Sequence, residues 1–198
     1  FFLLLFAWWS SLTIGLSSDE YFHHINGLVR YKFLISFGEI QKFEFRNNEF
    51  YPGLYDTISY ALGQIVFLIN KKFYANNIDV VMHFVNISFS TLSILGLYLL
   101  TQKLFNKKIA LITTLLTLLN PFFFGHMVMN SKDIIVFFAF IWSCYYFYLY
   151  CTEDNNLSKN LIFFSLFFGF GCGVRLTFVV VIFPVIIAGL YFLLRKYR

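Results

Sequence analysis

The stretch at residues 17–24, Ser-Ser-Asp-Glu-Tyr-Phe-His-His, interrupts a chain that is otherwise dominated by apolar side chains. It follows the first apolar run directly and carries two carboxylates and two imidazoles. Of the 198 residues, 59% are hydrophobic and 13% are charged, whereas a soluble domain carries about 25% charged residues. The sequence therefore predicts an all-α, polytopic membrane protein in which residues 17–24 lie at the mouth of a membrane helix.

The apolar runs predict about six membrane-spanning helices, with five as the alternative, in a single transmembrane domain over residues 1–198. The runs cover residues 1–17, 79–101, 109–124, 133–150 and 161–194. We divide the last run into two spans that meet near Arg175, because it is too long for one span and contains Gly169, Gly171 and Gly173. The apolar start and the basic last residues indicate a fragment.

The region 18–77 is mixed in composition and is expected to form a long outer loop with two amphipathic helices. Asp19–Ser36 and Leu54–Ile69 both repeat apolar residues at helical spacing. Between them, Gly38, Asn47-Asn48 and Pro52-Gly53 are helix breakers. We expect both helices to lie at the membrane surface.

The short basic loops set the orientation of the spans. Residues 102–108 contain three lysines, and two arginines and a lysine follow Leu194. Basic residues in short loops mark the cytoplasmic side. The other side then holds residues 18–77, residues 125–132 and the turn near Arg175. Because the basic residues are scattered among loops, the net charge of +5 does not indicate binding to nucleic acid.

This topology gathers a set of polar and ionisable groups on the outer side of the membrane. Such groups are costly at membrane depth unless they are paired, so a converging set predicts a functional site. The set consists of Asp19, Glu20, His23, His24, Asp56, His126, Asn130, Lys132, Asp133 and Arg175.

The residues around Asp19 and Glu20 allow more than one interpretation. Ser17 and Glu20 have the spacing of a capping box, which would fix the start of a helix. Asp19 and His23 are four residues apart, as are Glu20 and His24, so each pair lies on one helix face and could bind a divalent metal. Histidines that face lipid head groups would give the same pattern.

Residues 120–133, Asn-Pro-Phe-Phe-Phe-Gly-His-Met-Val-Met-Asn-Ser-Lys-Asp, form the second informative stretch. Pro121 and Gly125 are expected to end one helix, and Asp133 could cap the next. A plain polar turn between two spans is the simpler alternative. Arg175 could extend its side chain to the interface, or its guanidinium could bind a phosphate.

These stretches together resemble the GT-C class of membrane glycosyltransferases. The closest resemblance is to dolichyl-phosphate-mannose protein mannosyltransferases and lipid A aminoarabinose transferases, and it implies that the chain is the amino-terminal portion of such a protein. A first membrane helix followed at once by Asp-Glu at residues 19–20 is similar to their start. Residues 121–133 resemble the P-x-x-F-G-H-x-x-x-N-x-K-D run of bacterial members, with Ser131 where a proline is common. Residues 51–56, Tyr-Pro-Gly-Leu-Tyr-Asp, resemble the first loop of these enzymes.

The resemblance implies transfer of a hexosyl or pentosyl group from a polyprenyl-phosphate donor to a lipid, glycan or protein acceptor. Such transfer usually inverts the anomeric carbon, so a carboxylate must act as a base. The resemblance makes Asp19 this base, with Glu20 assisting. It assigns substrate binding to His126, Asn130, Lys132, Asp133, Arg175 and Asp56.

The resemblance also implies an integral membrane protein of a bacterial inner (plasma) membrane, with membrane lipid around it and its active site on the periplasmic face. A divalent metal ion is a possible cofactor, with Asp19, His23, Glu20 and His24 as candidate ligands. A transporter or flippase of a lipid-linked anion is the alternative, because it would also place charges near a broken helix. A scaffold that docks partners on residues 18–77 is a third.

Overall fold

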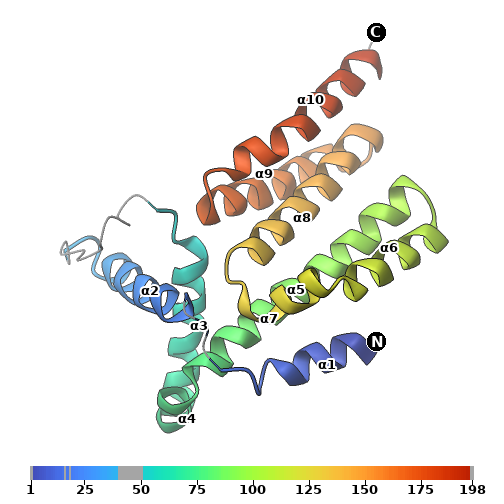
Figure 1. Ribbon diagram of the computed structural model, residues 1–198. Coiled ribbons are helices and arrows are strands. Elements are labelled where there is room, and N and C mark those ends of the chain that lie inside the picture. The colour runs from blue at the N-terminus through green and yellow to red at the C-terminus, as the bar shows by residue number, and fades with distance from the viewer. Residues whose placement is uncertain (1, 16, 18, 40–50, 197–198) are drawn as a thin grey trace.

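The computed structural model describes residues 2–15, 17, 19–39 and 51–196, and within them it is all-α, with no strand (Figure 1). The predicted breakers Asn47 and Asn48 lie outside these residues. The helices are α1 (Phe2–Ser10), α2 (Glu20–Ile35), α3 (Leu54–Ile69), α4 (Lys71–Asn76), α5 (Ile78–Leu104), α6 (Lys107–Leu119), α7 (Pro121–Met129), α8 (Asp133–Thr152), α9 (Leu157–Val174) and α10 (Phe178–Lys196).

The described residues contain four helices that are long and apolar enough to cross a membrane, namely α5, α8, α9 and α10. A fifth span results if α6 and α7, which are bent by 71° at Asn120, are taken as one. Helix α1, which falls in the first predicted span, has nine residues, whereas a span needs about 20. The polytopic all-α architecture is confirmed, and the described residues give four spans, or five with the bent pair, where the sequence predicted about six.

The end of the third predicted span differs from the prediction. Pro121 does not end a helix but begins α7, because a proline at the first helical position has no N–H that needs a partner. Asn120 caps this helix through its side-chain oxygen, which accepts hydrogen bonds from the N–H groups of Phe122 and Phe123. Gly125 therefore lies inside a helix rather than in a turn.

The predicted division near Arg175 is confirmed, but the glycines before it have another role. Helix α9 includes all three glycines and ends at Val174, and α10 begins at Phe178. A β-carbon on Gly171 would lie 2.6 Å from the Phe178 ring. The glycine thus allows the two helices to approach closely at their turn.

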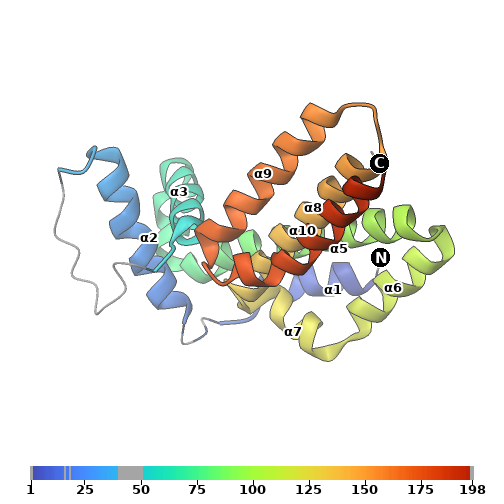
Figure 2. The same ribbon diagram turned by 90° about the horizontal axis from the view of Figure 1, so that it is seen from above.

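Helices α2, α3 and α4 lie together at one end of the bundle (Figures 1 and 2). The structure confirms α3 with the predicted bounds and places α2 within the predicted range, while α4 was not predicted. A β-carbon on Gly27 of α2 would lie 2.3 Å from the backbone oxygen of Asp56 in α3. The two helices are therefore in backbone contact, which only glycine permits.

Aromatic rings connect this end to the spanning helices. Phe89 of α5 contacts Phe138 of α8 with ring centroids 4.9 Å apart, and Tyr55 of α3 with centroids 6.3 Å apart. Phe138 in turn contacts Phe167 and Phe170 of α9. Rings from four helices therefore form one continuous set of contacts between α9 and α3.

Candidate functional site

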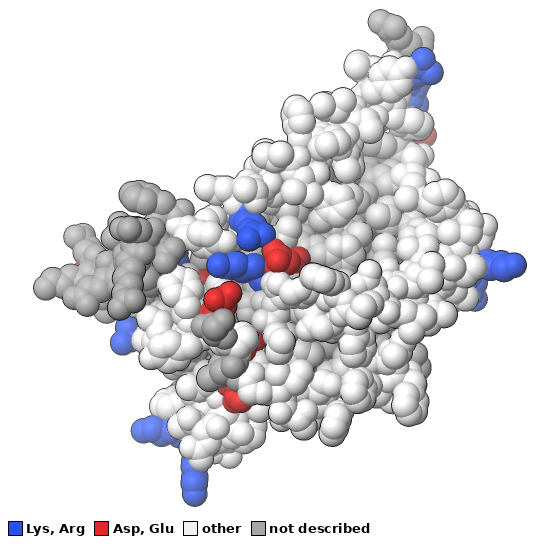
Figure 3. Space-filling view, in the orientation of Figure 1, with Lys and Arg blue, Asp and Glu red and all other residues white. Residues whose placement is uncertain are grey.

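Three segments that are distant in the sequence line one cavity of about 340 Å³. They are the start of α2, the connection from α7 to α8, and the break between α9 and α10. Figure 3 shows basic and acidic side chains gathered on one face, among uncharged atoms. The lining residues are Ser17, Asp19, His23, His126, Met129, Asn130, Ser131, Lys132, Asp133 and Arg175.

The cavity thus brings together seven of the ten polar residues that the topology gathered. Glu20, His24 and Asp56 do not line it.

Asp19 stands at the N-cap of α2 but does not use its side chain to cap the helix. Its carboxylate is exposed on the cavity wall, and it forms no hydrogen bond or ion pair within the described residues. Its backbone oxygen accepts the N–H of His23 at 3.0 Å, which places the two residues one helical turn apart. Asp19 is therefore free to meet a substrate.

Glu20, its neighbour, is completely buried and does not reach the cavity. Its Oε2 accepts the backbone N–H of Ser17 at 2.7 Å, which is one half of the predicted capping box. His83 of α5 places Nε2 2.9 Å from Oε1 and 3.0 Å from Oε2 of the same carboxylate. Glu20 therefore connects the start of α2 to the spanning helix α5.

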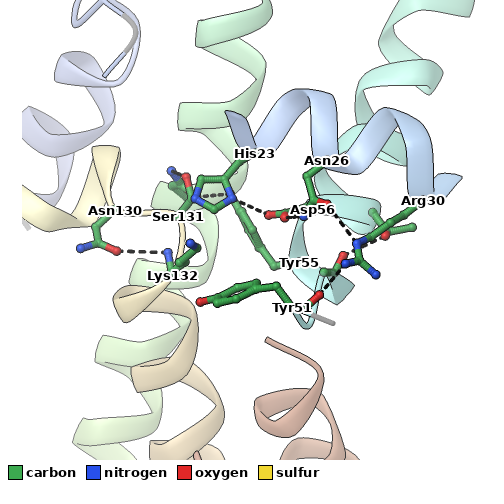
Figure 4. Close-up of polar contacts among 12 residues, drawn as sticks. His23, Asn26, Arg30, Tyr51, Tyr55, Asp56, Asn130, Ser131 and Lys132 are labelled. Carbon is green, nitrogen blue, oxygen red and sulfur yellow. Dashed lines mark hydrogen bonds and ion pairs between the residues drawn. The ribbon is translucent and has the colours of Figure 1, made fainter. Parts of the chain in front are cut away.

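Asp56 of α3 is also buried, and it serves as an acceptor for α2 (Figure 4). Its Oδ1 lies 2.9 Å from Nδ1 of His23, and its Oδ2 accepts a hydrogen bond from the Asn26 amide. The Asn26 oxygen in turn accepts Nε–H of Arg30 at 3.1 Å. Arg30 also donates to the backbone oxygen of Tyr51. Asp56 does not line the cavity itself, but it contacts His23, which does.

Asn130 organises the opposite wall of the cavity. Its Oδ1 accepts the N–H groups of Lys132 and Asp133, at 3.1 and 2.7 Å, immediately before α8 and at its first residue. The sequence suggested Asp133 as the cap of this helix, but Asp133 is its first residue, and the N-cap residue, Lys132, makes no side-chain cap. The Nδ2 group of Asn130 lies 3.0 Å from Nδ1 of His126 and 3.1 Å from Oδ2 of Asp133. One side chain thereby positions three others of the site.

The two cations of the cavity are held differently. Arg175 donates from a terminal nitrogen to Oδ1 of Asp133 at 2.6 Å, and both side chains are partly exposed. The Lys132 ammonium lies 4.4 Å from the centre of the Tyr51 ring. A cation over a ring keeps its charge and its hydrogen-bond donors. Both cations are thus available to an anion in the cavity.

The candidate metal ligands do not converge as the helical spacing predicted. The Glu20 carboxylate is taken by His83 and by the backbone of Ser17. His24 packs against Tyr60 and Tyr74, with ring centroids 5.3 and 6.4 Å apart, and burial lowers its pKa. Within the described ranges no group of three His, Cys, Asp or Glu residues could hold a metal ion. These residues do not fit a protein-held metal ion.

Sequence reasoning missed a buried polar layer behind the cavity. Tyr55 donates to Asn86, and Asn86 donates to the backbone oxygen of Val128 at 2.8 Å and to Oγ of Ser131 at 3.3 Å. Burial raises the pKa of Tyr55, which keeps its hydroxyl a donor. This layer joins α3, α5 and the cavity segment. A polar residue inside an apolar run, as Asn86 and His83 are, was the available signal.

Apolar helices of spanning length and a charged cavity at one end of the bundle define an integral membrane protein with a polar site. Comparison with protein families identifies it more closely. The model of the dolichyl-phosphate-mannose-protein mannosyltransferase family matches residues 60–198, more than half of the chain. The chain belongs to this family of membrane glycosyltransferases. Comparisons with the curated proteins and with the solved structures give no match.

The matched region divides the cavity. It includes His126, Asn130, Lys132, Asp133 and Arg175, whereas the α2 side lies before residue 60. The family match thus covers one wall, and the geometry alone links the other wall to it.

Proposed function

We propose that the chain transfers a sugar from a polyprenyl-phosphate donor to a hydroxyl acceptor, at the outer face of a bacterial inner (plasma) membrane. The observation that carries this proposal is the single cavity that joins Asp19 to Lys132 and Arg175. It places a carboxylate with no partner among the described residues opposite two cations. A base and an anion-binding group are the two elements that such a transfer needs.

The cations suit the leaving group. A polyprenyl-phosphate sugar carries one negative charge on its phosphodiester, and the phosphate gains a second as the bond to the sugar breaks. Arg175 is oriented by Asp133, and Lys132 by the ring of Tyr51. Donors held in place before the reaction stabilise the developing charge without reorganisation. His126 and Asn130, on the same wall, supply further polar contacts to the donor.

Asp19 is suited to act as the base toward the acceptor hydroxyl. It takes the proton of the acceptor hydroxyl while the oxygen attacks the anomeric carbon from the side opposite the phosphate, which inverts that carbon. Glu20 assists from a distance, because its bonds to Ser17 and His83 fix the helix start that carries Asp19.

The orientation rests on the basic loops. Lys103, Lys107 and Lys108 lie around the connection of α5 to α6, at the end of α5 remote from the cavity residues (Figure 1). If this end is cytoplasmic, the cavity opens on the outer side. The donor's lipid tail would remain in the membrane while its head group enters the cavity.

A transporter or flippase of a lipid-linked anion is less well supported. The polar groups gather at one end of the bundle rather than near its middle, where transport sites lie. The family of the chain also consists of transferases.

The test uses the full chain in native membrane vesicles, which supply the acceptor, with radiolabelled polyprenyl-phosphate hexose and pentose as donors. Asp19→Asn should lower transfer of label by about 100-fold or more, because the base is lost. Asp79→Asn makes the same chemical change in the first turn of α5, outside the cavity lining, and should leave transfer unchanged. Full transfer by Asp19→Asn at wild-type membrane levels would refute the base assignment. Label that crosses the membrane without being transferred would support the transporter instead.

A further inference from the structure

The buried contact between Asp56 and His23 has consequences for the chemistry of the cavity. Both side chains are almost fully buried, at 4% and 3% exposed. Both oxygens of Asp56 are engaged, Oδ2 by the Asn26 amide and Oδ1 by Nδ1 of His23. An amide NH₂ only donates, so Oδ2 is an acceptor. The Arg30 guanidinium joins the same network, because its Nε–H donates to the Asn26 oxygen.

As a carboxylate, Asp56 determines the tautomer of His23. A carboxylate can only accept, so Nδ1 of His23 must carry the hydrogen in the 2.9 Å contact. In the neutral imidazole this leaves the lone pair on Nε2. Nε2 has no hydrogen-bond partner within the described residues, and His23 belongs to the cavity lining. The structure therefore presents an unpaired proton acceptor to the cavity, one helical turn from Asp19.

We propose that His23, oriented by Asp56, receives the acceptor's proton from Asp19 and returns Asp19 to its ionised form in each turnover. This inference rests on the proposed function. The acceptor oxygen forms its bond to the anomeric carbon, and the bond from that carbon to the phosphate oxygen breaks with its electron pair on the phosphate. The hydroxyl proton moves to Asp19 and then to Nε2 of His23, directly or through a water, and finally to solvent.

The surroundings of His23 favour this path. The imidazolium that forms is in contact with the Asp56 carboxylate and shares the cavity with Asp19, and both negative charges stabilise it. The proton also ends on a group that shares the cavity with Lys132 and Arg175, where the phosphate has just become more negative. Asp56 is a positioning residue in this scheme, because it acts on the reaction only through His23.

Asp56→Asn separates this role from a structural one. The introduced asparagine has nearly the same shape and can still accept from Asn26, but its NH₂ would donate to Nδ1 of His23. The hydrogen of the imidazole then moves to Nε2, and the acceptor on the cavity wall is lost. We expect kcat to fall about tenfold or more, with the donor KM and the thermal unfolding midpoint close to wild type. Asp79→Asn is again the matched control.

Side-chain 15N NMR of the histidines gives a second readout that does not depend on activity. The chain has four histidines, so His23 can be assigned by comparison with His23→Gln. Wild type should show Nδ1 protonated and Nε2 unprotonated, and Asp56→Asn should show the reverse. A wild-type His23 protonated at Nε2, or an Asp56→Asn protein with wild-type kcat, would overturn the proposal.

Failure of the proposed function gives a different result. If the wild-type protein transfers no sugar while the NMR shows the expected tautomers, the transfer reaction is refuted and the orientation of His23 stands without its proton-transfer role. If Asp56→Asn does not accumulate in the membrane, His23→Gln tests the same step, because glutamine keeps a donor for Asp56 but is no proton acceptor. Wild-type kcat in His23→Gln would then refute the proton transfer.

Discussion

Two buried histidine–carboxylate pairs hold α2 in place, one against α3 and the other against α5, and they differ in their access to the cavity. His23–Asp56 and His83–Glu20 both have nitrogen–oxygen distances of 2.9 Å, and all four side chains are buried. His23 also lines the cavity, whereas both partners of the second pair are 0% exposed and Nδ1 of His83 has no partner in the described chain. The same contact thus holds two helices together in one place and prepares a proton acceptor in the other.

The largest expected effect comes from breaking the fully buried pair. Glu20→Ala would leave His83 without its partner and the N–H of Ser17 without an acceptor. Loss of one member of a buried pair costs about 3–5 kcal/mol. We expect the free energy of unfolding, measured by SDS titration in mixed micelles, to fall by about that amount.

A double-mutant cycle with His83→Ala is the control for that experiment. If Glu20 and His83 stabilise the fold through their contact, the double variant should lose much less free energy of unfolding than the sum of the losses in the two single variants. Additive losses would contradict the pairing. Asp133→Asn is a useful contrast, because the ion pair of Asp133 with Arg175 is partly exposed. This substitution should lower the free energy of unfolding by less than about 1 kcal/mol.

A smaller effect is expected where α2 and α3 touch. Gly27→Ala would place a β-carbon 2.3 Å from the Asp56 backbone oxygen, so the helices must separate. Overpacking of this kind costs about 1–3 kcal/mol, and the shift should also weaken the His23–Asp56 contact. We expect a lower free energy of unfolding together with lower transfer activity.

Gly125→Ala is the matched control, because nothing lies within 4 Å of a β-carbon there. Gly125 lies inside α7, where alanine favours the helix by up to about 1 kcal/mol. This variant should be neutral or slightly stabilising. An equal loss of free energy of unfolding in the two variants would show that the close approach of α2 and α3 at Gly27 does not contribute to stability.

The smallest effect concerns His24, which packs against tyrosine rings where His23 has a carboxylate. Burial lowers the pKa of His24 below its ordinary value, so the folded protein favours the neutral ring. The unfolded chain then binds more protons as the pH falls below about 6.5, and stability decreases in that direction. The unfolding midpoint of wild type should drop between pH 7.5 and 5.5 more than that of His24→Gln. An identical drop in the two proteins would contradict this.

The sequence was sufficient for the parts that depend on local patterns. Apolar periodicity predicted α3 with its observed bounds, and the polar stretches predicted residues 17–24, 126–133 and 175 on one side of the bundle. The spacing of four residues along a helix, however, did not predict the side-chain partners of Glu20 and His23. The partners of Glu20 and His23 are His83 and Asp56, which are far away in sequence but adjacent in the fold.

The remaining features depend on packing that one sequence does not display. Glu20 and Asp19 are neighbours of the same charge type, yet α5 buries one and leaves the other in the cavity. The helix from Pro121 to Met129 was missed because proline and glycine usually mark breaks. Here the Asn120 cap makes the proline a start, and Gly125 meets no neighbouring atoms.

The aromatic contacts from Tyr55 through Phe89 and Phe138 to α9 have a consequence for the precision of the site. Each ring has only two side-chain torsions, so ordering it costs less entropy than ordering a flexible side chain of similar size. Edge-on packing of rings further restricts their sliding. Tyr55 is one residue from Asp56, so the carboxylate that orients His23 stands on a stiff support. In a protein with 29 phenylalanines, ring contacts of this kind thus restrict the movement of the helix that carries Asp56.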